Sequence, residues 1–589
     1  MPARNKRCPC GSGKKYKNCC AEKDVATARN TTISDQLKNA GAFYQVGQPD
    51  EAQALYESVL KTSPNNKTAL FKLSLITASQ RDYAKSETLL KKVIKLEPGN
   101  PVYYSNLGFI LHEDNRPGEA VAALDKAISI KPDYADAYLN RANSLTIQGK
   151  IDDAIRDYRA ALEINPGSRQ ARGNMAYTMN FSPSLSEKEL FDAHKAHALT
   201  IEPRNRKPAH VNIPTSDRKL RIAYLSSEFR MHSVAYFIEP VLEHHNRNNF
   251  EVFAYYSHVI TDTTTEAITQ QCDHWRNVAR LSDPSLIRQI KKDEIDILID
   301  LNGYTAHNRL AVLAAKPAPV QCEWLGYPNT TGLDSMDYWI CDTTVNPPGL
   351  TDRFYSESLL RLPGCFICFK PPRDYPEPVE PPCLEKGYIT FASFNNYAKI
   401  SEKMLRLWAD ILKAVPDSRL MLKSACLGNQ VQRRAVIDFF ESMGICENRL
   451  QPEGYEPSRT KHMERYSAVD IALDTHPYNG TTTTCEAMWM GVPTISLAGN
   501  SHRSRVGKTL LESVGLGELV ADSDDQYKNI AINLAVDQHR LSEYRSCLRG
   551  MVDQSPLTDA AQFTASLESA YRSIWKAWCS NSSCPDDCR

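Results

Sequence analysis

Four stretches of this chain align without a gap at a spacing of 34 residues: GQPDEAQALYESVLKTSPNN (47–66), RDYAKSETLLKKVIKLEPGN (81–100), NRPGEAVAALDKAISIKPDY (115–134) and GKIDDAIRDYRAALEINPGS (149–168). They share a small residue near the start and a proline near the end: Ala52, Ser86, Ala120 and Ala154, then Pro64, Pro98, Pro132 and Pro166. A 34-residue period is typical of stacked helix–turn–helix units, in which the small residue lets two helices approach and the proline ends the second helix. The repeats therefore predict an α solenoid over residues 33–168, whose concave surface binds other chains.

These units resemble tetratricopeptide repeats. Residues 169–203 look like a fifth, degenerate unit, which is lengthened by the insertion NFSPSLSEKEL and ends at Pro203. The segment RNRKPAHVNIPTSDRK (204–219) reads as a linker. We therefore expect a repeat domain over residues 33–203.

The overall composition is that of a globular protein and gives no argument for a polyanionic or membrane partner. The 589 residues are 42% hydrophobic and 24% charged, and 70 basic side chains balance 70 acidic ones. The start, MPARNKRCPC, lacks the apolar stretch of a secretory signal, and the sequence has no run of 18 apolar residues. We therefore expect a soluble, cytoplasmic protein with no membrane partner. In that compartment the odd number of cysteines, 17, argues against a disulfide framework.

Residues 1–21 carry four thiols in the stretch CPCGSGKKYKNCC. Four cysteine ligands in so short a span suit one tetrahedral Zn²⁺, and the metal would supply the folding energy that a short peptide lacks. Gly11 and Gly13 allow a tight turn that brings the two pairs together. The segment resembles the SEC-C motif at the end of the SecA translocation ATPase, which implies a structural zinc ion. Its ligands would be Cys8, Cys10, Cys19 and Cys20. The alternative is a cysteine-rich start without structure.

The same segment is basic. It holds six Lys or Arg residues and no acidic residue before Glu22. Such a cluster favours an acidic partner such as a ribosome, and the alternative is a solvated basic tip.

The chain ends in a short polar segment, 576–589, which we predict to be a disordered tail. It contains Cys579, Cys584 and Cys588. Three thiols without a fourth ligand give little support to a second metal site, so we interpret them as unstructured thiols.

From Leu220 onward, short apolar runs alternate with helical stretches. LRIAYLS, FEVFAYY, IDILIDL, PVQCEWL and DYWICD read as one set of strands; YITFASF, RLMLKS, DIALD and PTISLA, after the proline-rich stretch 371–383, read as a second set. Alternating strands and helices imply parallel sheets, and two sets imply two doubly wound α/β lobes. A ligand would bind at the carboxyl ends of the strands, in a cleft between the lobes.

The densest signal for chemistry is LDTHPYNGTTTTCEAMWMGVP (473–493). Four threonines, 481–484, follow a turn and open a helix, whose free N–H groups and dipole favour an anion such as a phosphate. The carboxylate of Glu486, on the next turn, could accept the two hydroxyls of a ribose. The alternative is a threonine-rich helix cap without a ligand.

Two further segments follow strands of the same set and should face the same cleft. In FASFNNYAKI, Asn396 and Lys399 come just after a strand, and Lys399 could reach a diphosphate as a point charge. In YEPSRTKHMERY, Arg459, His462 and Arg465 precede a helix, and His462 could stack on a nucleobase. Each residue alone is more often structural, but the three segments together predict a nucleotide site.

In the first set of strands, three loops should face the cleft: SSEFRMHSVAYF (226–237), LNGYTAHNR (301–309) and LGYPNTTG (325–332). Glycines there permit close backbone approach to a ligand. His232 is the stronger candidate for the acceptor side and His307 the weaker one.

Taken in order, EFRMHSVAYF, LNGYTAHNR, PAPVQCEWLGYPNTTG, FNNYAKI and YNGTTTTCEAMWMGVP resemble motifs of glycosyltransferase family 41, the nucleocytoplasmic protein O-GlcNAc transferases and the related SPINDLY proteins. The resemblance implies a GT-B fold of two Rossmann-like lobes, with an acceptor-side lobe over 220–370 and a nucleotide-sugar lobe over 386–575. It implies transfer of a sugar to Ser or Thr hydroxyls with inversion and without a catalytic metal. It also implies that the tetratricopeptide repeats present acceptor proteins to the lobes.

The resemblance points to five candidate residues around the diphosphate and sugar of the donor. Lys399 is similar to the family lysine that neutralises its charge. Thr482 and Thr483 match diphosphate-binding threonines, and Thr481 precedes them where the animal enzymes have histidine. Asn396 takes the place of a diphosphate or sugar contact.

The remaining candidates follow from the same resemblance. His462 matches a histidine that stacks on the base, and Arg459 falls where a base-contacting lysine is found. Arg465 belongs to the same donor segment, and Glu486 replaces an aspartate that holds the ribose. His232 matches the histidine proposed as the catalytic base.

Three functions stay open on the sequence. The first is transfer of N-acetylglucosamine from UDP-GlcNAc to protein hydroxyls. Because FNNYAKI and GTTTTCE look closer to SPINDLY proteins, which use GDP-fucose, protein O-fucosyl transfer is the second. The third is a repeat scaffold whose transferase lobes no longer act, and the intact Lys399, threonine run and Glu486 favour an enzyme instead.

Overall fold

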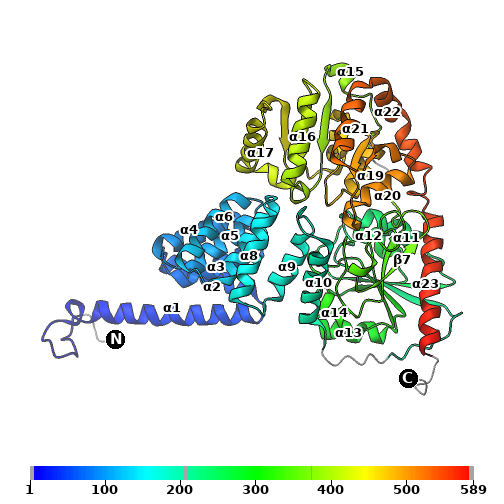
Figure 1. Ribbon diagram of the computed structural model, residues 1–589. Coiled ribbons are helices and arrows are strands. Elements are labelled where there is room, and N and C mark those ends of the chain that lie inside the picture. The colour runs from blue at the N-terminus through cyan, green and yellow to red at the C-terminus, as the bar shows by residue number, and fades with distance from the viewer. Residues whose placement is uncertain (1–4, 204–209, 373–374, 583–589) are drawn as a thin grey trace. The chain divides into compact units, whose positions relative to one another are not determined.

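The computed structural model describes residues 5–203, 210–372 and 375–582 (Figure 1). The chain separates into two compact units, Met1–Ser144 and Leu145–Arg589. The boundary falls inside a helix of the fourth repeat, α7 (Ala135–Ile147). Across the described ranges, no helix combines the length and the apolar character needed to cross a membrane.

The first unit is built from helical hairpins. Its elements are η1 (Tyr16–Asn18), α1 (Ala21–Gln45), α2 (Pro49–Thr62), α3 (Lys67–Ser79), α4 (Tyr83–Leu96), α5 (Pro101–Glu113), α6 (Pro117–Ile130) and most of α7. Helices α2, α4 and α6 each end just before the repeat proline, which cannot continue a helix. Ala52, Ser86 and Ala120 are fully buried, so the small residues do let the helices pack closely. The predicted α solenoid is confirmed.

The turn inside each unit needs a left-handed residue. At this position φ is +78° at Gly47, +63° at Arg81, +58° at Asn115 and +73° at Gly149. Glycine adopts this conformation without steric cost, and asparagine tolerates it better than most residues. The same backbone turn therefore recurs with the sequence period.

The last repeats belong to the second unit. Helices α8 (Ile151–Ile164), α9 (Arg169–Met179) and α10 (Glu187–Ile201) share one apolar core with the sheet that follows them. That core includes Ile151 and Leu190 from the helices, Phe181 from the turn after α9, and Leu225, Tyr255 and Leu298 from the strands. The expected repeat domain, 33–203, is thus divided: its last three helices are built into the α/β part of the chain.

The first lobe is a seven-stranded parallel sheet in the order β3-β2-β1-β4-β5-β6-β7. Its strands are β1 (Leu220–Ser226), β2 (Phe250–Tyr256), β3 (His274–Asn277), β4 (Ile297–Asp300), β5 (Val320–Glu323), β6 (Tyr338–Asp342) and β7 (Ser358–Leu362). Its other elements are α11 (Ala235–His244), α12 (Thr263–Gln270), α13 (Asp283–Lys292), α14 (Leu310–Ala314) and η2 (Asp352–Phe354). Because the strands are parallel, the loops after β1, β4 and β5 lie at one edge.

The second lobe is a six-stranded parallel sheet in the order β10-β9-β8-β11-β12-β13. Its strands are β8 (Thr390–Ser393), β9 (Arg419–Lys423), β10 (Leu450–Glu453), β11 (Ile471–Leu473), β12 (Thr494–Leu497) and β13 (Val520–Ala521). Its α-helices are α15 (Cys383–Lys386), α16 (Glu402–Ala414), α17 (Gln430–Ser442), α18 (Arg459–Glu464), α19 (Thr482–Trp489), α20 (Val506–Ser513), α21 (Asp524–Val536) and α22 (Gln538–Asp553). Short 3-10 turns are η3 (Tyr397–Lys399), η4 (Ala425–Gly428), η5 (Glu447–Arg449), η6 (Arg465–Ala468), η7 (His502–Ser504) and η8 (Gly517–Leu519).

The last helix, α23 (Ala560–Ser582), packs on the first lobe, beside α11, and is red in Figure 1. Tyr571 and Trp575 are fully buried in the core of that lobe. The prediction of a disordered tail over 576–589 is therefore wrong for residues 576–582, which belong to α23. Cys579 lies in this helix and is buried, whereas Cys584 and Cys588 lie outside the described residues.

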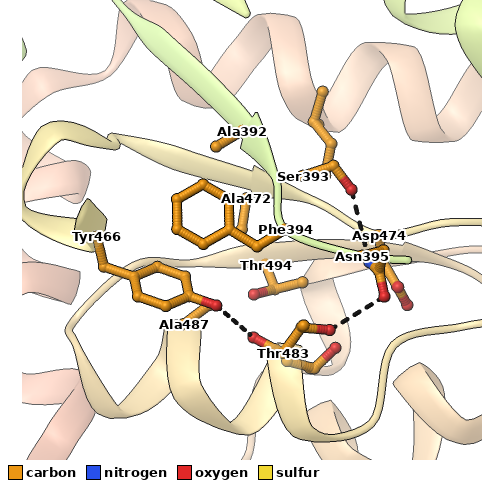
Figure 2. A pocket seen from close by; sticks show the side chains of 12 residues that line it. Ala392, Ser393, Phe394, Asn395, Tyr466, Ala472, Asp474, Thr483, Ala487 and Thr494 are labelled. Carbon is orange, nitrogen blue, oxygen red and sulfur yellow. Dashed lines mark hydrogen bonds between the residues drawn. The ribbon is translucent and has the colours of Figure 1, made fainter. Parts of the chain in front are cut away.

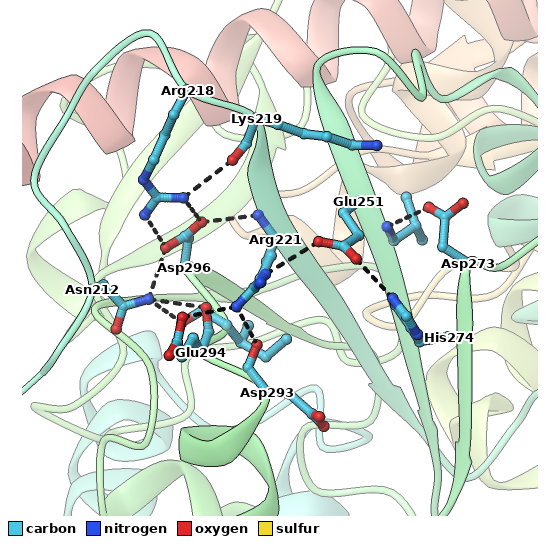
Figure 3. Close-up of polar contacts among 12 residues, drawn as sticks. Asn212, Arg218, Lys219, Arg221, Glu251, Asp273, His274, Asp293, Glu294 and Asp296 are labelled. Carbon is cyan, nitrogen blue, oxygen red and sulfur yellow. Dashed lines mark hydrogen bonds and ion pairs between the residues drawn. The ribbon is translucent and has the colours of Figure 1, made fainter.

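Charged side chains join the amino-terminal ends of neighbouring strands in the first sheet (Figure 3). The buried carboxylate of Asp296 accepts hydrogen bonds from Arg218 (2.6 Å), from the side-chain amide of Asn212 (2.7 Å) and from the backbone N–H of Arg221 (2.9 Å). The Arg221 guanidinium in turn pairs with Glu251 on β2 at 3.1 Å. Asn212 and Arg218 precede β1, so these contacts fix the entry of the chain into the lobe.

Candidate active site

The candidate site lies at the carboxyl ends of the second lobe's strands. After β11, the buried carboxylate of Asp474 accepts hydrogen bonds from the N–H groups of Thr475 (2.8 Å) and Gly480 (2.6 Å) and from the Ser496 hydroxyl (2.7 Å). Burial raises the pKa of this carboxyl to about 6. The segment 474–480, here called the donor turn, is therefore shaped around one acidic side chain.

The threonine run opens α19, as the sequence predicts. Thr484 is buried, and its hydroxyl donates to the Gly480 carbonyl at 3.2 Å. Thr481, Thr482 and Thr483 are half-buried, so a ligand can reach them. The run thus divides into one residue that braces the helix and three that remain accessible.

Figure 2 shows how β8 and β11 meet the start of α19. The Thr483 hydroxyl donates to Oδ1 of Asn395 at 3.1 Å, and the Tyr466 hydroxyl reaches the Thr483 carbonyl at 3.4 Å. With Phe394 and Asp474 these residues line a cavity of about 20 Å³. That volume holds about one water molecule. This cavity is therefore too small to hold a nucleotide.

The asparagine that contacts the threonine run is not the one that the sequence singled out. Asn395 is buried and was not predicted. Its neighbour Asn396 is exposed, and its side chain caps η3 by accepting from the Ala398 N–H at 3.1 Å. The repeated asparagine in FNNYAKI gave no signal that would separate the two.

Lys399 reaches the donor turn from the adjacent strand end. Its Nζ donates to the Asn479 carbonyl at 2.9 Å and lies 4.0 Å from the centre of the Tyr478 ring. Burial lowers the pKa of this ammonium to about 8, and the Asp474 carboxylate opposes the shift. Two residues 80 positions apart in the sequence, from segments that were both predicted to face the cleft, therefore meet at this ammonium.

His462 and Glu486 also meet. Nε2 of His462 lies 3.3 Å from Oε2 of Glu486, and Nδ1 lies 2.7 Å from Nζ of Lys423. Because an ammonium can only donate, Nδ1 accepts and Nε2 carries the proton toward Glu486. Lys423 ends β9 and was not predicted; desolvation lowers its pKa. Lys423, His462 and Glu486, here called the His462 trio, hold the imidazole beside Phe394, with the two ring centres 5.9 Å apart.

The two arginines of this segment have different surroundings. The Arg459 guanidinium lies 4.3 Å from the Tyr236 ring centre, and its Nε donates to the Tyr375 hydroxyl at 3.1 Å. Arg465 pairs instead with the carboxylate of Glu453, at 2.9 Å from Nε, which ties the end of α18 to β10. Arg459 therefore links the second lobe to Tyr236 of the first lobe, and Arg465 braces its own lobe.

His232 lines a larger cavity, of about 390 Å³, together with Tyr236, Lys370 and Arg459. Its Nδ1 accepts a long hydrogen bond from the Val234 N–H at 3.3 Å. Desolvation lowers the pKa of this imidazole below its usual value, so it is neutral near pH 7. A neutral imidazole is the form that a proton acceptor requires.

The N-terminal cysteines gather within the first unit. The sulfur atoms of Cys8, Cys10, Cys19 and Cys20 all lie within 4.8 Å of one another. Four sulfurs around Zn²⁺, each at about 2.3 Å, would be separated by about 3.8 Å. Gly11 and Gly13 take φ values of +79° and +69°, which permits the predicted turn. The four thiols therefore form a cluster that fits one tetrahedral metal ion.

Comparison with protein families gives three kinds of match. The model of the family described as Glycosyl transferase family 41 matches residues 197–370 and 383–567. Tetratricopeptide repeat models match residues 37–101, 102–134 and 135–168. The SEC-C motif matches residues 4–22. All three resemblances seen in the sequence are confirmed.

Individual relatives carry names of one kind. A protein of Petunia hybrida called probable UDP-N-acetylglucosamine–peptide N-acetylglucosaminyltransferase SPINDLY is 41% identical over 420 residues, which are 70% of this chain and 45% of that protein. The Arabidopsis thaliana protein with the same activity name and the suffix SEC is 31% identical over 373 residues, 62% of this chain and 38% of the other. The chain thus spans about half the length of the curated relatives it matches.

A solved structure matches nearly the whole chain. It is a mutant of the Thermobaculum terrenum O-GlcNAc transferase in which a lysine is replaced by methionine. It is similar with a TM-score of 0.77 and 32% identity, over 94% of this chain and 99% of that one. The expected architecture, a helical repeat array followed by a two-lobed GT-B fold, is confirmed.

Proposed function

This chain belongs to glycosyl transferase family 41, and from the residues that meet at the donor turn we propose that it is an inverting protein O-glycosyltransferase. The observation that carries the proposal is the ammonium of Lys399, held at the donor turn beside the start of α19. A fixed cation and a helix N-terminus together suit the diphosphate of a nucleotide sugar. The donor that we propose is UDP-GlcNAc, as the relatives' names suggest.

The proposed reaction is a direct displacement at the anomeric carbon. Negative charge builds on the leaving diphosphate, and Lys399 with the free N–H groups at the start of α19 stabilises it. Thr481 and Thr482 add hydroxyl donors to the phosphate oxygens, and the Thr483 hydroxyl, which donates to Asn395 in the structure, would turn toward them when the donor binds. Asn396, which is exposed beside them, would contact the sugar.

The nucleoside would lie against the His462 trio. The imidazole of His462 stacks on the base, and the carboxylate of Glu486 accepts from the ribose hydroxyls. In the structure these two groups bond to each other. Arg459 would contact the base, and Arg465 would hold α18 in place through Glu453.

On the acceptor side, His232 would take the proton of the attacking Ser or Thr hydroxyl. Its neutral state and its place on the wall of the 390 Å³ cavity support this role. Holding the hydroxyl in line with the leaving group would supply much of the rate enhancement. The repeats would select the acceptor proteins.

The remaining assignments concern the ends of the chain. We propose that the SEC-C motif holds one structural Zn²⁺ and that its basic residues face an acidic partner such as a ribosome. We propose a cytoplasmic location, since the fold requires no oxidising compartment for its thiols.

The test is a binding screen followed by a transfer assay. The melting temperature of the protein is measured with UDP, UDP-GlcNAc, GDP and GDP-fucose, because a ligand that binds only the folded state raises it. We expect the uridine compounds to raise it and a labelled acceptor protein to gain N-acetylglucosamine. A rise with the guanosine compounds alone would support the fucosyl alternative, and no rise with any of them would support the inactive scaffold.

A further inference from the structure

The turn that ends α9 reaches the donor turn. The ring of Phe181 stacks on the ring of Tyr478, with centroids 5.3 Å apart and planes inclined by 15°. On Tyr478 sits the ammonium of Lys399, 4.0 Å from the ring centre. Phe181 is buried. A side chain of the degenerate fifth repeat thus supports the aromatic face that holds the candidate catalytic cation.

Arg503 provides a second connection between the fifth repeat and the donor turn. The buried Arg503 donates from Nη1 to the Asn180 carbonyl at 2.9 Å and pairs with Glu187 of α10 at 3.0 Å. Its own carbonyl accepts from the Asn479 N–H at 2.8 Å. The Asn479 carbonyl is the acceptor for Lys399. Two residues of the 180–190 insertion, Asn180 and Glu187, are therefore tied through Arg503 to the backbone of the donor turn.

A third contact comes from the turn between α7 and α8. A Cβ at Gly149 would lie 3.3 Å from the ring of Tyr397, in the same 3-10 turn as Lys399. Ala398, between them, is buried in the core that also holds Ile151 and Phe181. The backbone that carries Lys399 is therefore packed directly against the repeats.

We propose that the degenerate fifth repeat is part of the donor site, in which Phe181 is a positioning residue that acts through Tyr478 on Lys399. The inference rests on the proposed function for its meaning, since Lys399 is the group that would meet the diphosphate. A lysine side chain has many rotamers, and a charge stabilises a leaving group only when it is already in place. The Tyr478 ring supplies a cation–π contact that fixes the ammonium, and Phe181 keeps that ring from turning away.

The first test measures Lys399 directly and needs no activity. The full-length parent, Phe181→Leu and Tyr478→Leu are treated with acetic anhydride, and acetylation of Lys399 is measured by mass spectrometry against the exposed Lys461. We expect several-fold faster acetylation of Lys399 in both variants and no change at Lys461. Equal rates at Lys399 in the parent and in Phe181→Leu would overturn the proposal, whatever the protein transfers.

The second test asks whether Phe181 acts through Lys399. Alone, Phe181→Leu should lower kcat about 10- to 100-fold with little change in KM for the donor, and Phe181→Tyr should restore it, because the stacking face returns. In a Lys399→Met background, Phe181→Leu should have little further effect, because the group that it positions is gone. Full additivity of the two substitutions would overturn the proposal.

A matched control separates positioning from general destabilisation. Ile290→Ala truncates a fully buried side chain of the same core, on α13. It should lower the melting temperature without coupling to Lys399→Met and without faster acetylation of Lys399. If the parent shows neither nucleotide binding nor transfer, the proposed function fails, and the acetylation result still decides the positioning of Lys399.

Discussion

The positive charge of Lys399 is held by neutral groups, a carbonyl oxygen and an aromatic face. Neither of these two partners carries a negative charge, although the nearby Asp474 carboxylate also favours the charged ammonium. The same burial that orients the ammonium also lowers its pKa to about 8. The burial of Lys399 thus sets both the position and the protonation of its ammonium, and substitutions at this residue can test both.

The first prediction concerns turnover and its dependence on pH. Lys399→Ala should lower kcat on the order of a hundredfold to a thousandfold, and it should weaken donor binding less. Lys399→Arg should rescue poorly, because a planar fork does not replace a compact ammonium. In the parent, kcat/KM for the donor should fall as the pH rises through about 8, because the ammonium of the donor-free protein loses its proton there. Steady-state transfer at several pH values measures both, and an unaltered kcat in Lys399→Ala would refute the site.

Two buried carboxyls of the first lobe form a pair that should make the stability of the protein depend on pH. Asp300 and Glu323 stand opposite each other on β4 and β5, and both are fully buried. Apart from each other, Oδ1 of Asp300 and the two carboxylate oxygens of Glu323 have no hydrogen-bond partner among the described residues. Burial raises the pKa of Asp300 to about 6 and that of Glu323 well above its usual value. The pair therefore keeps protons that the unfolded chain releases.

The second prediction follows from the sign of these shifts. The folded state binds more protons than the unfolded state above pH 4, so the free energy of unfolding should fall as the pH rises from about 4 through 6 and beyond. Glu323→Gln removes one such group and offers an N–H to Asp300. It should stabilise the protein by about 1–3 kcal/mol at pH 8 and hardly at all at pH 4. Urea unfolding at the two pH values measures this.

The matched control is Glu357→Gln, which should act in the opposite direction. Glu357 is equally buried, but its carboxylate accepts from the Thr330 hydroxyl at 2.6 Å and from the Thr331 N–H at 2.7 Å. An amide in its place would lose one of these bonds and destabilise the fold. Equal effects of the two substitutions would contradict the argument from missing donors.

At these sites, sequence reasoning selected candidates by their chemistry and passed over residues that the structure packs against them. Lys399, the threonine run, His462 and Glu486 were predicted because each follows a strand with a group that suits a phosphate, a base or a ribose. Tyr478 and Phe181 gave no such signal, because an aromatic residue in a repeat or a turn usually belongs to the core. Their contact depends on two segments almost 300 residues apart, which no local pattern reveals.

At the scale of elements, the strength of the periodic signal decided what could be predicted. The repeat helices were predictable because proline, turn residue and small residue recur together. The central strands were predictable from their apolar runs. Strands β3 (HWRN) and β10 (LQPE) lack such runs, since edge strands are not buried on both faces. Helix α23 extends into the predicted tail because Trp575 and Cys579 pack on the first lobe.

The third prediction belongs to the N-terminal motif. Purified without chelator, the protein should carry about one zinc ion per chain, because four thiolates satisfy a tetrahedral site. Cys10→Ser should release most of it, since three ligands bind more weakly, and Cys579→Ser should retain it. Elemental analysis measures the metal. Deletion of residues 1–21 should remove the zinc and leave transfer to a short peptide nearly unchanged; zinc that persists after the deletion would place the site elsewhere.

For the whole molecule, the boundary between the two compact units does not coincide with the end of the repeats. It falls at residues 144–145, whereas the repeats continue to residue 203. The compact division lies within α7, and α8, α9 and α10 share their core with the first sheet. Through Phe181 in the turn after α9, and through Glu187 of α10, this segment also contacts Tyr478 and Arg503 of the second lobe. A truncation at the end of the repeats would therefore remove helices that belong to the core of the second unit. A truncation at residue 145 would leave that unit intact.

The fourth prediction compares these two cuts. A chain that begins at residue 145 should bind the nucleoside diphosphate selected by the melting screen with nearly the parent's affinity, because every contact of the donor turn described above is kept. It should glycosylate a short peptide but lose protein acceptors, since most of the concave array is gone. A chain that begins at residue 204 should melt at a lower temperature and bind the diphosphate at least about tenfold more weakly, because it exposes the core under α10 and frees Tyr478 and Arg503. Calorimetric titration of both chains measures the difference. If the shorter chain bound as tightly as the longer one, the degenerate repeat would serve only to join the array to the lobes.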